Sequence, residues 1–171
     1  MMRRLAFIVL ALGLAAPAAR AQGGLSSAHL GASFGISVPL GDISHDHSSG
    51  FNLGASAEFD APGQAMGVRG ELLYEHFAAD QSRTNVGAIQ AGSATINAIY
   101  HFQGQTFHPY LIGGMGVYSV TDQSARPGLN GGVGFEIPLT GMTAHFEARI
   151  HKVLTNGRSY VSLPISFGLS F

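Results

Sequence analysis

The chain has 171 residues, of which 46% are hydrophobic and only 11% charged, and it contains no cysteine. This composition excludes a disulfide scaffold and a disordered charged chain, and the net charge of −1 argues against a nucleic-acid partner, which would need a basic face. After residue 21 no apolar run reaches the roughly 18 residues of a membrane-spanning helix, which leaves an all-β chain.

The first 21 residues predict an export signal. Residues 1–4 are basic, residues 5–16 form an apolar run, and Ala19-Arg20-Ala21 places small residues where a signal peptidase cleaves. The apolar run is too short to cross the ~30 Å hydrocarbon core as a helix. We therefore expect a signal peptide at 1–21, cleavage after Ala21, and one mature domain at 22–171.

Alternation of apolar with small or polar residues predicts eight strands in the mature chain, because side chains of a strand point to opposite faces in turn. In chain order the predicted strands are 29–40, 51–59, 67–77, 93–102, 108–120, 128–139, 143–153 and 160–171. Glycines on both faces of 108–120 leave the orientation of that strand open.

The connections between the predicted strands alternate in character. Those at 60–66, 103–107 and 138–142 are short, those at 41–50, 78–92 and 152–159 are longer and more polar, and 120–127 is intermediate. Membrane β-barrels have an even strand number, short turns at one end and longer loops at the other. Closure is required in lipid, because an open sheet edge would leave backbone groups unpaired.

Three segments carry a resemblance to a known family. The closing strand ends in Phe171, the segment 108–118 contains Pro109-Tyr110 and Gly114-Met115-Gly116, and Gly131-Gly132-Val133-Gly134-Phe135 follows. Together they resemble the OmpA-type small outer-membrane proteins, whose fold is an eight-stranded antiparallel up-and-down transmembrane β-barrel.

The resemblance also implies a location and partners. We expect export through the periplasm to the cell outer membrane, with outer-membrane lipid and lipopolysaccharide around the wall. The barrel-assembly machinery is the implied assembly partner, and Phe171 is the expected assembly signal.

A soluble eight-stranded barrel of the lipocalin kind is the competing fold. In that fold the apolar faces would surround a ligand, and the polar face of 143–153 would be ordinary solvated surface. Aromatic residues at both predicted rims instead favour lipid outside, as girdles do. The expected girdle residues are Phe59, Phe102 and Phe171 at one rim and Phe51, Tyr74, Tyr118 and Tyr160 at the other.

Two charged rows predict an ion-paired interior. Arg69, Glu71 and Glu75 share one face of 67–77, and Glu147 and Arg149 share one face of 143–153, which lies directly opposite in an eight-stranded barrel. Matching their heights places Arg69 level with Glu147 and Arg149 between Glu71 and Glu75, so we predict ion pairs across the lumen.

Other interior residues complete this prediction. Glu58 and Glu136 are two further inward acids, which a shared proton or the inward histidines His101, His145 and His151 would balance. The bulky residues of 143–153 should find room beside small residues on the neighbouring strands. These small residues are Gly128, Gly132, Gly134, Ser162, Ser166 and Gly168.

Candidate chemistry is limited. The segment His45-Asp46-His47-Ser48-Ser49 combines residue types used in nucleophilic catalysis and in metal binding. A catalytic triad converges from separate elements and two histidines make an incomplete zinc site, so a polar external loop is favoured over a metal role. His76 invites comparison with enzymes that modify lipid A, but no serine and acid motif accompanies it. The glycines at 113–116 lie on a strand without a following helix, which excludes a phosphate loop. We predict no catalytic residue, cofactor or metal.

Three functions compete. The leading hypothesis is a non-enzymatic outer-membrane barrel with a side-chain-filled interior that displays external loops for envelope integrity or surface interaction. A small pore is an alternative, disfavoured because the interior of eight strands is just filled by side chains. An outer-membrane lipid-modifying enzyme is the second alternative function. No motif identifies a partner for the loops.

Overall fold

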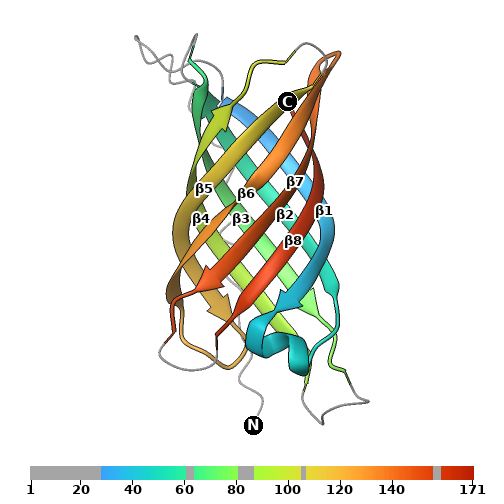
Figure 1. The fold of residues 1–171 in the computed structure, drawn as a ribbon, viewed down its shortest axis with the longest axis vertical. Coiled ribbons are helices and arrows are strands. Elements are labelled where there is room, and N and C mark those ends of the chain that lie inside the picture. The colour runs from blue at the N-terminus through green and yellow to red at the C-terminus, as the bar shows by residue number, and fades with distance from the viewer. Residues whose placement is uncertain (1–27, 61–63, 81–86, 105–106, 156–158) are drawn as a thin grey trace.

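The computed structural model describes residues 28–60, 64–80, 87–104, 107–155 and 159–171. Its eight antiparallel strands follow one another around a closed barrel, and β1 pairs with both β2 and β8 (Figure 1). The strands are β1 Ala28–Leu40, β2 Gly50–Asp60, β3 Met66–Phe77, β4 Ile89–His101, β5 His108–Val120, β6 Arg126–Leu139, β7 Met142–Val153 and β8 Val161–Ser170, with a 3-10 turn η1 at Gly41–His45. The predicted fold class is confirmed, whereas the predicted signal peptide lies outside the described residues.

Two strands begin two or more residues earlier than predicted. β4 starts at Ile89 instead of residue 93, and β6 starts at Arg126 instead of residue 128. The added residues of β4 continue the ladder with β3 as far as the Phe77↔Ile89 pair. The backbones of the added residues pair with the neighbouring strands, although their side chains do not alternate cleanly between apolar and polar. Alternation alone therefore did not predict these residues as strand.

The exterior of the barrel is apolar all the way round, since the outward row of every strand exposes large hydrophobic side chains. Examples from successive strands are Phe34, Leu53, Leu72, Ile96, Met115, Val133, Ile150 and Ile165. No helix in the described part of the chain is long and apolar enough to span a bilayer. The apolar outside and polar inside exclude the soluble ligand-binding alternative, in which these faces would be reversed.

The strands' short connections and Phe171 lie at one end of the barrel, which we call the turn end, and η1 and the longer connections lie at the other, the loop end (Figure 1). Phe59, Phe102 and Phe171 are exposed at the turn end, as predicted for a girdle. The prediction was wrong for Tyr118 and Tyr160, whose rings are buried in the interior.

The orientation of β5, which the sequence left open, explains the error for Tyr118. The inward row of β5 carries Tyr110, Ile112 and Tyr118, all buried. Their rings lie over glycines of β6, because a Cβ at Gly134 would overlap the Tyr110 ring and one at Gly128 would lie 2.6 Å from the Tyr118 ring. Glycines of β6 therefore make space for tyrosines of β5 inside the barrel.

Candidate functional site

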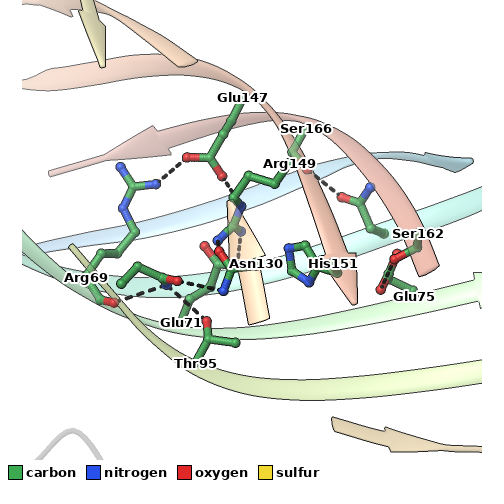
Figure 2. A network of polar contacts seen from close by, with 12 residues as sticks. Arg69, Glu71, Glu75, Thr95, Asn130, Glu147, Arg149, His151, Ser162 and Ser166 are labelled. Atoms are coloured by element: carbon green, nitrogen blue, oxygen red, sulfur yellow. Dashed lines mark hydrogen bonds and ion pairs between the residues drawn. The ribbon is translucent and has the colours of Figure 1, made fainter. Parts of the chain in front are cut away.

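The middle of the barrel holds a buried set of charges that we call the arginine network, formed by Arg69, Glu71, Glu147 and Arg149. Glu147 links the two arginines: one of its oxygens lies 2.8 Å from Arg69 Nη1 and the other lies 2.6 Å from Arg149 Nε. Arg149 also pairs with Glu71 through Nη2. The network joins β3 to β7 across the lumen, as Figure 2 shows.

Neutral side chains complete the hydrogen bonding of this network. The Tyr110 hydroxyl donates to Glu147 at 2.7 Å, and the Arg69 guanidinium lies over the Tyr110 ring, 5.4 Å from its centre. Asn130 donates to Asn97 Oδ1 at 2.8 Å, and Asn97 in turn donates to the backbone oxygen of Arg69. Tyr110, Asn97 and Asn130 were missed by the sequence reasoning, because their neighbours are known only once the register of β5 is fixed.

Glu75 lies apart from the arginine network, toward the loop end (Figure 2). Within the described residues it forms no ion pair with Arg149, so that part of the predicted placement was wrong. Instead the Ser162 and Tyr160 hydroxyls donate to Glu75 Oε2 at 3.2 and 3.3 Å. Hydroxyl groups of β8 and its preceding residue thus hold a carboxylate that the sequence assigned to an arginine.

Small residues stand beside the bulky side chains of β7, as expected, although the partners differ. A Cβ at Gly132 would lie 2.7 Å from Arg149 Cγ, and one at Gly168 would overlap the His145 ring. Gly128 and Gly134 face the tyrosines of β5 instead of β7. A tightly filled interior results, in which glycines on β6 and β8 accommodate side chains from both neighbouring strands.

The turn end of the interior carries a second group of ionisable residues. Glu58 on β2 accepts a hydrogen bond of 2.7 Å from Arg69 Nε. His101 on β4 lies between Glu58 and Glu136, with Nε2 at 3.6 Å from the first carboxylate and 3.5 Å from the second. His101 is therefore the inward histidine that faces the two additional acids, whereas His151 contacts the Tyr118 hydroxyl.

An apolar cluster, which we call the loop-end cap, fills the interior at the loop end. Its buried members are Ile43, Phe77, Ala91, Tyr118, Val120, Val153 and Tyr160. Ile43 belongs to η1, so the first connection itself contributes a side chain to the closure. Ile43 could not be predicted from periodicity, because a single apolar residue in a polar loop forms no repeating pattern.

Hydrogen bonds join the connections at the loop end to one another and to the strands. Asp42 accepts from the backbone of Ser159 at 2.7 Å, and Gln90 and Thr121 exchange hydrogen bonds of 2.9 and 3.1 Å. The β2–β3 pairing continues beyond the wall in an isolated bridge between His47 and Ala79. The described parts of the connections are therefore anchored to the barrel rim.

The remaining candidate residues do not assemble a catalytic site in the described part of the chain. His47 is buried and its Nε2 lies 3.1 Å from the backbone oxygen of Gly87, whereas His45 is exposed. The His76 ring packs against Phe51 with centres 5.4 Å apart, and no described serine or carboxylate bonds to it. A lipid-modifying enzyme would need those groups.

Comparison with solved structures places the fold among outer-membrane barrels. Neisserial surface protein A matches with a TM-score of 0.69 and 17% identity over 86% of this chain and 98% of that protein. Ail of Yersinia pestis matches at 0.53 and 16% over 85% and 99%. The N-terminal barrel of Pseudomonas aeruginosa OprF matches at 0.52 and 18% over 87% and 100%.

Comparison by sequence gives the family. No curated protein matches the sequence closely enough to count as a relative. The profile of the family described as the outer membrane protein beta-barrel domain matches residues 6–171. Together with the closed eight-stranded barrel, its apolar outside and its charged interior, this match shows that the chain belongs to the outer membrane protein beta-barrel domain family.

Proposed function

We propose that this protein is a non-enzymatic outer-membrane barrel with a closed interior, which displays its external connections for envelope integrity or surface interaction. The observation that carries the proposal is the pairing of Arg69 and Arg149 with Glu147 across the lumen. A wall braced from within by buried ion pairs is suited to holding loops in place and poorly suited to passing solutes.

The loop end supports the same proposal. Ile43 is inserted into the loop-end cap, and Asp42 bonds to the backbone of Ser159, so the first and last connections are fixed relative to each other. Neisserial surface protein A and Ail, the attachment invasion locus protein, have a similar fold, and their names refer to the cell surface and to attachment. We propose that this chain puts the fold to a similar use.

Export and assembly are part of the proposal. The mature barrel would be exported through the periplasm, folded by the barrel-assembly machinery, and surrounded by lipid and lipopolysaccharide. In this orientation the turn end faces the periplasm and the loop end faces outside, as in other outer-membrane barrels.

Complementation of a deletion strain tests the proposed function. The strain should lose barrier integrity or surface attachment, and the wild-type gene should restore the lost property. A variant with residues 41–49 and 78–88 replaced by short Gly-Asn turns should assemble but fail to restore it. Full restoration by this loop-replaced barrel would contradict the proposal.

The enzymatic alternative has its own readout. Mass spectra of lipid A from cells with and without the protein should be identical under the proposal. A change in acyl chain number or mass that depends on His76 would instead establish a lipid-modifying enzyme.

A further inference from the structure

Three potential metal ligands converge inside the barrel at the turn end. Glu58, His101 and Glu136 come from β2, β4 and β6, and one ligand atom from each lies within 4.8 Å of the others. We call them the turn-end cluster. His101 Nε2 is buried and has no hydrogen-bond partner among the described residues. A buried ring nitrogen without a partner is costly unless something binds it.

The distances in the cluster suit a shared metal ion better than direct hydrogen bonds. His101 Nε2 lies 3.6 Å from Glu58 Oε1 and 3.5 Å from Glu136 Oε2, both beyond the usual hydrogen-bond range. Metal–nitrogen and metal–oxygen bonds of about 2.1 Å at a tetrahedral angle separate two ligand atoms by about 3.4 Å. The observed separations are close to that value.

Arg69 forms a hydrogen bond with the Glu58 carboxylate and a longer ion pair with the Glu136 carboxylate. Its Nε donates to Glu58 Oε2 at 2.7 Å, and its Nη2 lies 3.8 Å from Glu136 Oε1. Each carboxylate thus presents its other oxygen to the histidine. Partners that hold the second atom of a ligating group in this way are typical of metal sites.

The charge of the interior also favours a cation. Among the described residues, the interior holds five glutamates, Glu58, Glu71, Glu75, Glu136 and Glu147, and two arginines, Arg69 and Arg149. The formal charge of these seven residues is −3. Access is available at the turn end, since the side chains of His101 and Glu136 are 21% and 16% exposed. A divalent ion could enter there and offset most of the excess.

We propose that Glu58, His101 and Glu136 bind one first-row divalent transition-metal ion, such as Zn²⁺, inside the turn end of the barrel. One imidazole nitrogen with two carboxylate oxygens is a ligand set for such ions, whereas Ca²⁺ and Mg²⁺ prefer oxygen alone. Three protein ligands leave a fourth position for water. The ion would tie β2, β4 and β6 together, a role beyond that of the external loops.

Metal binding by the folded, tag-free barrel tests the proposal. The chelator-treated protein in detergent would be dialysed against Zn²⁺, and bound metal would be measured by mass spectrometry. The wild type should bind about one equivalent, and His101→Gln and Glu136→Gln should each weaken binding about tenfold or more. His29→Gln is the matched control, because His29 is an exposed histidine at the same end, and it should bind like the wild type.

The metal-binding results can be separated from effects of the substitutions on folding. Only the heat-modifiable, folded fraction of each variant would be measured, and Co²⁺-soaked crystals of the wild type provide a readout that needs no variant. An anomalous peak within bonding distance of His101 Nε2 would support the site. Absence of wild-type binding, or loss of binding in His29→Gln alone, would overturn the proposal and leave His101 as a protonated ion-pair partner of the two glutamates.

Discussion

Individual residues in the interior show how a barrel can bury charge in a membrane. Glu147 bonds to Arg69, Arg149 and Tyr110, so both of its oxygens are satisfied. Burying a charge is costly, and the cost is offset only where partners and hydrogen bonds are complete. The arginine network meets that condition, which makes each member depend on the others.

Arg149→Ala should therefore destabilise the barrel strongly. The substitution leaves Glu71 without its arginine, and breaking a buried pair in this way costs about 3–5 kcal/mol. Arg126→Ala, at the exposed start of β6, is the control and should change stability by less than about 0.5 kcal/mol. Thermal unfolding of the two variants in detergent would show the contrast, and equal effects would argue against a braced interior.

Glycines beside the interior tyrosines provide a second test at this scale. Gly134→Ala places a Cβ against the Tyr110 ring and 2.7 Å from the Phe146 carbonyl oxygen, so we expect a loss of about 1–3 kcal/mol. Gly113→Ala adds the same atom on the outward face of β5, where the nearest atom lies at 3.8 Å, and should be nearly neutral. Denaturant unfolding would measure both; a neutral Gly134→Ala would mean that the interior is loosely packed.

At the scale of elements, η1 is the part of the chain that sequence alone could not place. It forms because residues 41–45 turn back over the loop end and bury Ile43 in the loop-end cap. Backbone bonds from Asp46 and His47 to the Ile43 oxygen close the turn. The contact holds the first connection against the strands.

Ile43→Ala should loosen this connection without unfolding the wall. Removing the buried side chain takes away much of what anchors η1, so the His47 amide, which donates to the Ile43 oxygen at 3.1 Å, should exchange with solvent faster. Hydrogen-exchange measurements would compare this variant with His45→Ala, which alters an exposed neighbour. Unchanged exchange of the His47 amide would show that Ile43 does not anchor η1.

The seam between β1 and β8 allows a prediction about assembly. The backbone of Phe171 exchanges hydrogen bonds of 2.9 Å with Leu30, and the residue is 68% exposed at the turn end. Phe171→Ala keeps the backbone bonds and removes the proposed signal for the assembly machinery. We expect less heat-modifiable barrel in the outer membrane than for Phe107→Ala, an exposed ring at the same end. Equal amounts would remove that role from Phe171.

Most of the wall could be predicted because strand alternation is a strong signal where one face meets lipid. The inward and outward rows of β1, β2, β3, β4, β6, β7 and β8 follow the predicted pattern. β5 could not be oriented, since its glycines occur on both faces, and the interior partners of Tyr110 and Tyr118 depended on it. Glu75 was wrongly predicted to pair with Arg149, because two residues at a similar height in the barrel need not contact each other across the lumen.

At the scale of the whole molecule, the interior contains three successive layers of side chains from the turn end to the loop end. They are the turn-end cluster, the arginine network and the loop-end cap. The first two are charged and joined through Arg69, and the last is apolar. Each layer bridges strands that are not neighbours, which makes the barrel a braced cylinder rather than an open tube.

Conductance in planar bilayers tests the claim of a closed interior most directly. Barrel shown to be folded by its heat-modifiable migration would be reconstituted at increasing protein concentration beside a wide porin as a positive control. A closed interior should give no stepwise current from the wild-type protein at any concentration that yields porin steps. Reproducible current steps from the wild type, with an amplitude proportional to salt concentration, would contradict it and show a water-filled lumen.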